Sequence, residues 1–364
     1  MKTESIIIND RLIIEDYLNI SDRHRVLFID IETTGLSAHN SYIYMIGSVS
    51  YKGDDLIFTS MLAESASEEE QLLKSLIESL KDYDFLIHYN GLTFDLPFID
   101  SRCAVYGLKA DICSYKSLDI YKQVSSLKYI LNLPKCRQKD IEQYMGIARE
   151  DKYSGGELIN VYKEYIKTGD AELYKLLFTH NYEDVTGMVR IMPMLSYTAL
   201  FAGNFTVTGI DYDSYTSYSG KDVKELLIGL KSAFLVPVPF SLNKDGCFLT
   251  YKGNAGTLKV PVYNDEFKYF YEDYKDYYYL TKEDMAVHKS VAIYVDKEYR
   301  QKAKASNCYT RKSGEFLPEW EPIYAPIFKP EYNSRQMYFE VLSSLSEDTG
   351  RLKDYTIHII RHMQ

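Results

Sequence analysis

The feature that most constrains this chain is an apolar run that two acids interrupt and a turn ends. Residues 26–36 read Val-Leu-Phe-Ile-Asp-Ile-Glu-Thr-Thr-Gly-Leu. An apolar run bounded by a turn signal predicts a buried strand, and alternate residues of a strand share one face. Asp30 and Glu32 should therefore project from the same side, where their charges repel unless a cation lies between them. A hard divalent cation with oxygen ligands meets that need, whereas two solvated acids at a strand end are the simpler alternative.

Composition is typical of a globular protein. The chain has 364 residues, 46% of them hydrophobic and 26% charged, which allows one large or two ordinary domains. No run approaches the ~20 apolar residues of a membrane span, and the N-terminus shows no signal peptide. The 5 cysteines have irregular spacings and no Cys-x-x-Cys pair, which favours reduced thiols. We therefore expect a cytoplasmic protein without a membrane partner.

Charge is distributed unevenly along the chain. The net charge of -10 argues against a generally basic nucleic-acid binder. Residues 1–200 hold 21 Lys and Arg against 30 Asp and Glu, whereas residues 201–364 hold 21 against 22. Acidity in the first half suits a carboxylate metal site there, and it leaves any contacts with nucleic acid to local basic patches.

Periodicity predicts an α/β domain over residues 25–199, after a short lead-in of residues 1–24. Further strands are expected at residues 42–51, 56–62, 84–89 and 117–121. Helices are expected from Ser67, with Glu70 completing a capping box, and at residues 126–147, 157–167 and 170–196. Three strands, a helix and a strand are how an α/β layer with a mixed sheet begins.

Three more residues in this domain are candidates for a site. Asp95 follows the Asn90-Gly91 turn at a strand-to-helix junction, which is the usual place for functional groups in open α/β sheets. A cap on its own helix is the simpler role for Asp95. His180 and Asp184 are four residues apart and share one helical face, a spacing that is more often a surface interaction.

The four carboxylates and the histidine stand in a recognisable order along the chain: Asp30, Glu32, Asp95, His180 and Asp184. This order resembles the DEDD superfamily of 3′–5′ exonucleases, which have a ribonuclease-H-like fold. Residues 30–36 fit its first motif, and residues 90–95 fit its second, with the spacing of family B polymerase proofreading domains. The third motif departs from the family, because His180-x-x-x-Asp184 puts histidine at the spacing of the tyrosine branch.

A closer resemblance is to bacterial ribonuclease-H-like proteins of YprB type. The stretches that carry it are residues 30–36, 90–98, 142–147, 154–157 and 181–185. The resemblance covers roughly residues 25–195, about half the chain. It implies fold and reaction type better than it implies a substrate.

The resemblance implies a metal site with two Mg²⁺ or Mn²⁺ ions. Asp30 would bridge the ions, and Glu32 and Asp184 would complete the ion that activates water. Asp95 would hold the second ion through ordered water.

The resemblance also implies contacts with a nucleic acid, DNA or RNA, at a single-stranded 3′ end. His180 would accept the proton of the attacking water, which an imidazole can do near neutral pH. Leu36 and the backbone at Thr33 and Thr34 would pack against the terminal nucleoside, and Asn90 belongs to the same substrate set.

Residues 200–364 predict a Tyr-rich α+β domain with a role in guiding nucleic acid. An extended connector is expected at residues 236–239, and two strands are expected to flank residues 253–256. The tyrosines of residues 267–279 could stack on bases, although such runs are more often half-buried packing. Residues 297–312 hold 6 basic residues and 1 acid. They are either a solvated charged helix or an arm that touches phosphates through Lys302, Lys304 and Arg311.

The leading hypothesis is a metal-dependent nuclease, most simply a two-metal-ion 3′–5′ exonuclease of DEDD type. One alternative is a nucleic-acid-binding module on the same fold with weak or no catalysis. Another is an endonuclease of ribonuclease H type. A complete carboxylate set favours an enzyme, since a pure binder has little use for four buried acids. The sequence leaves the choice of DNA or RNA, the pathway and the oligomeric state open.

Overall fold

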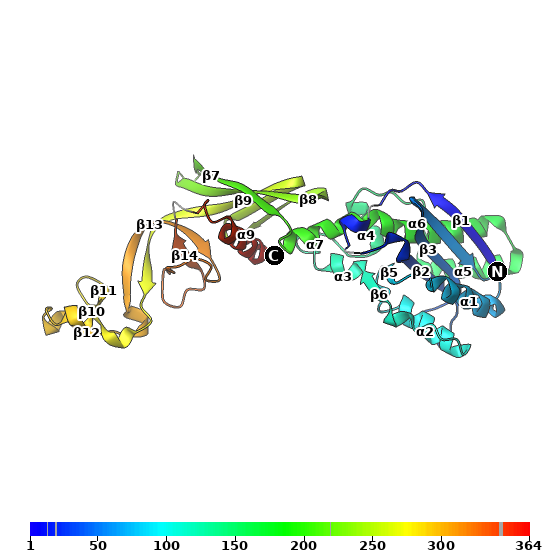
Figure 1. Ribbon diagram of the computed structural model, residues 1–364, viewed down its shortest axis with the longest axis horizontal. Coiled ribbons are helices and arrows are strands. Elements are labelled where there is room, and N and C mark those ends of the chain that lie inside the picture. The colour runs from blue at the N-terminus through cyan, green and yellow to red at the C-terminus, as the bar shows by residue number, and fades with distance from the viewer. Residues whose placement is uncertain (13, 19, 219, 342–344) are drawn as a thin grey trace. The chain divides into compact units, whose positions relative to one another are not determined.

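The computed structural model of the chain describes residues 1–12, 14–18, 20–218, 220–341 and 345–364. The chain divides into two compact units, Met1–Thr198 and Ala199–Gln364, which run from blue to green and from green to red in Figure 1. Among the helices that the structure describes, none combines the length and apolar character that crossing a membrane requires.

The first unit is built on a six-stranded mixed sheet in the order β1-β4-β3-β2-β5-β6. The pairs from β1 through β4 and β3 to β2 are antiparallel, whereas β2, β5 and β6 are parallel. The strands are β1 (Lys2–Ile8), β2 (Val26–Thr33), β3 (Ile43–Lys52), β4 (Asp55–Leu62), β5 (Phe85–His88) and β6 (Lys116–Asp119). The expected strands are all present, and the supposed lead-in contributes β1, an edge strand of the same sheet.

Helices cover both faces of this sheet (Figure 1). The helices of this unit are α1 (Glu69–Leu80), α2 (Asp95–Val105), α3 (Ile120–Ser125), α4 (Gln138–Tyr144), α5 (Gly155–Thr168) and α6 (Ala171–Ile191), whereas α7 (Leu195–Phe201) spans the boundary to the second unit. On one face, apolar residues of α1 and α2 pack against Leu27, Ile29 and Ile31 of β2. On the other face, α5 and α6 pack against Tyr44 and Met45 of β3. Because side chains alternate along a strand, the even-numbered acids of β2 face α6.

Two local predictions for the first unit are wrong. Ser67 does not cap α1, because its hydroxyl pairs with that of Ser65 and the helix begins only at Glu69. Residues 126–147 are not one helix, since only α4 within them is helical beyond isolated turns. Asn132 with φ 53° and the following Pro134 break the backbone there.

A glycine lets α6 lie close to the sheet. Gly47 of β3 pairs with Asp30 of β2, so it lies directly beside the predicted site. A Cβ atom at Gly47 would come within 2.5 Å of the Asn181 side chain and 2.7 Å of the Val185 side chain, both on α6. The register between β2 and β3 also shifts after Glu32, an irregularity that is common next to functional sites.

The second unit contains two antiparallel sheets and a C-terminal helix, so the prediction of an α+β region is confirmed. The larger sheet has the order β14-β13-β9-β8-β7 and the smaller one β11-β10-β12. The strands are β7 (Thr206–Thr216), β8 (Asp222–Lys244), β9 (Cys247–Phe270), β10 (Tyr277–Leu280), β11 (Met285–His288), β12 (Arg300–Lys302), β13 (Tyr309–Glu319) and β14 (Met337–Glu340). Helix α9 (Thr349–Met363) packs on β7, β8 and β9, and a short helix α8 (Lys289–Ala292) follows β11.

Three expectations for the second unit are corrected. Residues 236–239 are not a connector but lie inside β8, where prolines without N–H groups coincide with breaks in the β8–β9 register. Residues 253–256 do not separate two strands, since all of them lie within β9. Residues 297–312 are not a helix, because they form short turns, β12 and the start of β13.

Candidate active site

The five predicted residues come together in the first unit from three separate elements. Asp30 and Glu32 lie near the end of β2, and Asp95 is the first residue of α2. His180 and Asp184 lie one turn apart on α6. All five line one cleft with a volume of about 610 Å³, which we call the acidic cleft.

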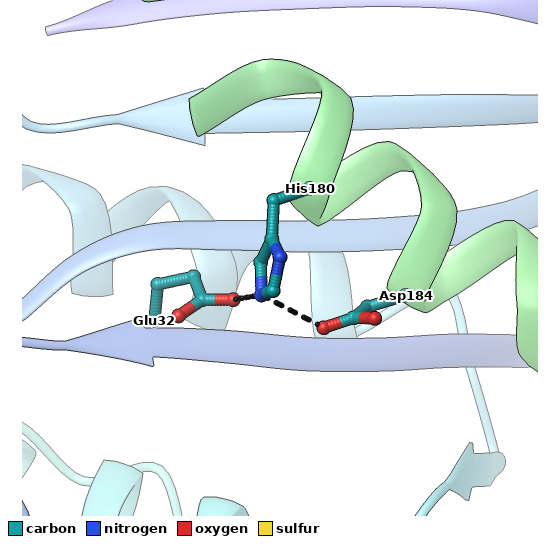
Figure 2. A group of neighbouring side chains, drawn as sticks. All are labelled: Glu32, His180 and Asp184. Carbon is teal, nitrogen blue, oxygen red and sulfur yellow. Dashed lines mark ion pairs between the residues drawn. The ribbon is translucent and has the colours of Figure 1, made fainter. Parts of the chain in front are cut away.

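His180 lies between two of the carboxylates, as Figure 2 shows. Its Nε2 atom is 3.2 Å from Glu32 Oε1 and 3.0 Å from Asp184 Oδ2. One ligand atom from each of these three residues lies within 4.8 Å of the others. The unusual spacing of the third motif therefore leaves the imidazole directed at the same carboxylates that the first and third motifs supply.

The other ring nitrogen of His180 is held by a residue that the sequence analysis missed. His180 Nδ1 lies 2.8 Å from Asp151 Oδ2, and the same oxygen accepts a hydrogen bond from Lys139 Nζ at 2.8 Å. The backbone amide of Asp151 donates to Glu183 Oε2 of α6 at 2.9 Å. Asp151 therefore fixes the ring orientation that turns Nε2 toward Glu32.

A half-buried arginine, also missed, is bound to Asp184. Arg149 Nη1 donates to Asp184 Oδ1. The other two guanidinium nitrogens bind Glu142: Nε donates to Oε2, and Nη2 donates to Oε1 at 2.8 Å. Gln138 Nε2 donates to Glu142 Oε1 at 2.9 Å and to the Asp184 carbonyl at 2.7 Å. Because residues 149–151 have no regular structure, no periodicity could have revealed Arg149 or Asp151.

Three carboxyl groups of the cleft hold protons more tightly than ordinary acids, and burial is the main reason that the pKa of one of them, Glu32, is raised. Burial raises the pKa of Asp30 well above its usual range, and the charges of Asp95 and Glu32 add to that effect. Burial also raises the pKa of Asp95 to about 7, although its Oδ1 accepts a hydrogen bond from the Ile31 amide at 3.3 Å. Asp30 and Asp95 therefore lie where additional positive charge would be stabilising.

The opposite effect operates around His180. Burial acts to lower the pKa of His180, but hydrogen bonds with Asp184 and Glu32 outweigh burial and raise the pKa to about 11. Burial acts to raise the pKa of Asp184, yet His180 and Arg149 lower it to about 2. These two cations compensate the acids that face them.

The residues predicted to touch a terminal nucleoside lie around β2 and the turn after β5. Thr33 is buried, and the Thr34 hydroxyl accepts a hydrogen bond from the Tyr42 amide at 3.1 Å. Leu36 is 88% exposed, which leaves its side chain free to pack against a ligand. Asn90 is exposed, has φ 62° and lines the acidic cleft.

The sequence analysis predicted contacts with the phosphates of a nucleic acid only in the second unit, through Lys302, Lys304 and Arg311. Arg311 Nη1 is 3.2 Å from Glu266 Oε1, so its charge is already paired. The acidic cleft has basic residues of its own that the sequence analysis missed. They are Arg137, Lys139 and Lys152.

Comparison with known proteins supports a fold for the first unit. A family described as RNase_H superfamily, RNase_H_2, matches residues 27–196. Together with the sheet order, this match confirms the prediction of a ribonuclease-H-like mixed sheet with flanking helices.

Matches to individual proteins are shorter or more distant. A DNA polymerase of Methanocaldococcus jannaschii is 39% identical over 49 residues, which are 14% of this chain and 3% of the polymerase. The family B DNA polymerase of Pyrobaculum calidifontis is 12% identical with a TM-score of 0.36, covering 71% of this chain and 35% of that one. A zinc-bound complex of E. coli ExoI with ssDNA is 14% identical with a TM-score of 0.28, covering 58% of this chain and 55% of that one.

Proposed function

We propose that this chain is a divalent-metal-dependent nuclease that hydrolyses phosphodiester bonds, acting as a 3′–5′ exonuclease of DEDD type related to the YprB group. The observation that carries the proposal is the convergence of Asp30, Glu32, Asp95, His180 and Asp184 on one cleft. These residues come from positions up to 154 residues apart in a 364-residue chain, yet each supplies a ligand or a base to the same space.

The residues present fit a hard divalent cation. Carboxylate oxygens are the ligands that Mg²⁺ and Mn²⁺ prefer, and Glu32 and Asp184 present such oxygens within 4.8 Å of each other, with His180 between them. The raised pKa values of Asp30 and Asp95 reflect a shortage of positive charge that such ions would relieve. Two bound ions would supply a hydroxide nucleophile at neutral pH and stabilise the leaving oxygen.

The remaining roles belong to side chains. His180 would accept a proton at Nε2, while Asp151 keeps Nδ1 occupied and the ring in place. His180 can do this only when Glu32 and Asp184 are engaged elsewhere, because these two carboxylates hold the proton on the ring here. Arg149 would keep Asp184 in position, and Lys152 at the cleft would attract the phosphate backbone.

One observation favours the alternative of a binding module without catalysis. His180 and Arg149 between them already contact both oxygens of Asp184. If this compensation persists when cations are present, the site would hold no ion, and the fold would serve only to bind nucleic acid.

The experiment that separates these functions uses end-labelled single-stranded and double-stranded DNA and RNA. Each substrate is incubated with the full chain in Mg²⁺, Mn²⁺ or a chelator, and a circular single strand is included. We expect stepwise shortening of linear single strands from the 3′ end with either metal, no cleavage in chelator, and an intact circle. Cleavage of the circle would show an endonuclease, and binding without any cleavage would show the binding module.

A matched pair of variants ties the activity to the cleft. Asp30→Asn should abolish cleavage because it removes the proposed bridging carboxylate, while Asp82→Asn makes the same change at an exposed position. Melting temperatures should show that both variants fold, and Asp30→Asn should be at least as stable without metal because a repulsive charge is lost. Full activity in Asp30→Asn would contradict the proposed metal-dependent nuclease mechanism.

A further inference from the structure

A basic, tyrosine-lined groove lies in the second unit around the three-stranded sheet. It has a volume of about 710 Å³ and is lined by Tyr274, Lys275, Tyr277, Tyr278, Lys289 and Lys302, among others. Arg300 also lines it, so the groove contains four basic side chains, and no carboxylate belongs to its lining in the described part of the chain. We call this site the tyrosine groove. Because the chain as a whole has a net charge of -10, this local positive patch is suited to binding a negatively charged ligand.

The four basic side chains of the groove differ in whether they already have a hydrogen-bond or ion-pair partner. Lys289 Nζ pairs with Asp276 Oδ1 at 2.6 Å, and Arg300 donates to the Ala292 carbonyl. Lys275 and Lys302, in contrast, form no ion pair with any residue that the structure describes, and both are exposed. Two unpaired charges therefore remain available to phosphates.

The adjacent tyrosines of β10 differ in whether another aromatic ring covers one of their faces. The Tyr277 ring stacks on Tyr271 with centroids 4.5 Å apart, so one of its faces is covered. On Tyr278, which points to the other side of the strand, no ring stacks within the described residues. The Arg300 guanidinium lies over its ring, 5.4 Å from the ring centroid. Across the ladder, Tyr278 is directly opposite Lys302, which places this half-buried ring beside an exposed cation.

We propose that the tyrosine groove binds single-stranded nucleic acid, with an unpaired base on Tyr278 and the adjoining phosphates at Lys302 and Lys275. Phosphate attraction alone would suit any polyanion, but a partly accessible aromatic ring flanked by cations is the arrangement on which unpaired bases stack. A duplex keeps its base faces buried, so the groove should discriminate against it. The inference rests on the proposed function and deepens it, because it names single-stranded nucleic acid as the ligand of a chain that is proposed to cleave nucleic acid.

The test measures binding rather than cleavage. Fluorescence anisotropy in chelator follows labelled oligothymidylate, oligouridylate and a DNA duplex as they bind the full chain carrying Asp30→Asn. Tyr278→Ala added to this background should weaken single-strand binding roughly 5- to 100-fold, the scale of one stacked base. Tyr278→Phe should retain affinity because the ring remains. Lys302→Glu, an exposed change that leaves the strand intact, should weaken binding and make its salt dependence shallower.

A matched control is Tyr294→Ala, since Tyr294 is 85% exposed near the same sheet but does not line the groove. Its affinity should equal that of the Asp30→Asn chain. Equal losses in Tyr278→Ala and Tyr294→Ala, unchanged affinity in both Tyr278→Ala and Lys302→Glu, or tighter binding of duplex would each overturn the proposal. Groove-dependent binding in a chain that never cleaves would reject the nuclease and keep the groove.

Discussion

The acidic cleft of the first unit and the tyrosine groove of the second handle charge in opposite ways. In the cleft, two half-buried acids are compensated inside the protein, Glu32 by His180 and Asp184 by Arg149. In the groove, Lys275 and Lys302 face solvent without a carboxylate partner among the described residues. Removing a buried partner leaves an uncompensated charge, whereas removing an exposed one changes little but the attraction for a ligand.

Because the two regions differ in how their charges are compensated, different measurements are sensitive to changes in each of them. Changes in the cleft should alter chemistry and stability, because its charges are desolvated and coupled. Changes in the groove should alter affinity and its dependence on salt, because its charges are solvated and screened. Each variant below is expected to affect one region and leave the property of the other unchanged.

The largest effect should come from His180. His180→Ala should lower the cleavage rate on the order of 10²–10³-fold, the usual scale for a positioned base. Metal-dependent cleavage should fall as pH is lowered, since a protonated imidazole cannot accept a proton. His180→Tyr should recover part of the rate, because it recreates the third motif of the tyrosine branch at its own spacing. Rates are measured with a labelled single strand at several pH values.

His180 variants also probe the comparison, because binding in chelator at the tyrosine groove should not change. A near-wild-type rate for His180→Ala would show that His180 is structural and that the hydroxide forms without its help. A loss of oligonucleotide affinity equal to the loss of rate would contradict the separation of the two regions.

A second effect is a pH-dependent stability that belongs to the cleft alone. The pKa of Asp95 is raised from 3.8 to about 7, so between these values the folded chain keeps a proton that the unfolded chain releases. Stability without metal should therefore fall as pH rises through that window, by about 2 to 3 kcal/mol between about pH 5 and about pH 8. Asp95→Asn should flatten this part of the profile, since asparagine can still accept the hydrogen bond from the Ile31 amide.

Urea unfolding in chelator at both pH values checks this prediction, with Asp82→Asn as the exposed control. The control should keep the wild-type slope. A profile for Asp95→Asn as steep as that of the wild type would show that other groups cause the loss of stability at high pH.

The sequence was sufficient to predict the first unit's sheet and to single out five residues that meet in one cleft, because both depend on local signals. The strand of residues 26–33 follows from an apolar run with a turn, and the site residues follow from short motifs in a fixed order. Arg149 and Asp151 could not be predicted. They lie in an irregular loop, and their partners Asp184 and His180 are 35 and 29 residues away, so only the folded chain brings them together.

The second unit was harder to predict because its strands continue past residues that usually end strands. Proline at 237 and 239 and glycine at 253 and 256 are local break signals, yet β8 and β9 pair on both sides of them. Long-range pairing outweighs the local preference there, at the cost of two register shifts. The tyrosines gave no indication of which ones are covered, since Tyr277 and Tyr278 differ only in the face of β10 that they occupy.

The docking of α6 provides a third and smaller effect. Gly47→Ala would place a Cβ atom within 2.5 Å of the Asn181 side chain, so the helix must shift or the side chain must move. We expect a loss of about 1 to 3 kcal/mol in unfolding free energy, as for other overpacked cores. The cleavage rate should fall by more than the loss of folded protein accounts for, because His180 and Asp184 belong to the displaced helix.

A matched control for this change is Gly156→Ala in the first turn of α5, where nothing lies within 4 Å of the added carbon. Alanine in a helix is more favourable than glycine, so this variant should be slightly more stable. Urea unfolding and cleavage rates are compared for the two variants. Equal stability of both would mean that α6 does not need Gly47 to approach the sheet.

The smallest effect should distinguish two basic residues of the second unit that the sequence treated alike. Replacing Lys302, Lys304 and Arg311 together by alanine should weaken oligonucleotide binding and reduce the salt slope, because fewer counterions are released. The structure divides this set, since Arg311 pairs with Glu266 and donates to the Glu283 carbonyl at 3.1 Å, while Lys302 lines the groove. Lys302→Ala alone should therefore reduce the slope by about 0.7, the value for one phosphate of a single strand, and Arg311→Ala should leave it unchanged. Anisotropy titrations at several salt concentrations measure both slopes. If Arg311→Ala reduces the slope as much as Lys302→Ala does, a paired surface cation contributes as much as an unpaired one, and the contrast between compensated and open charge fails.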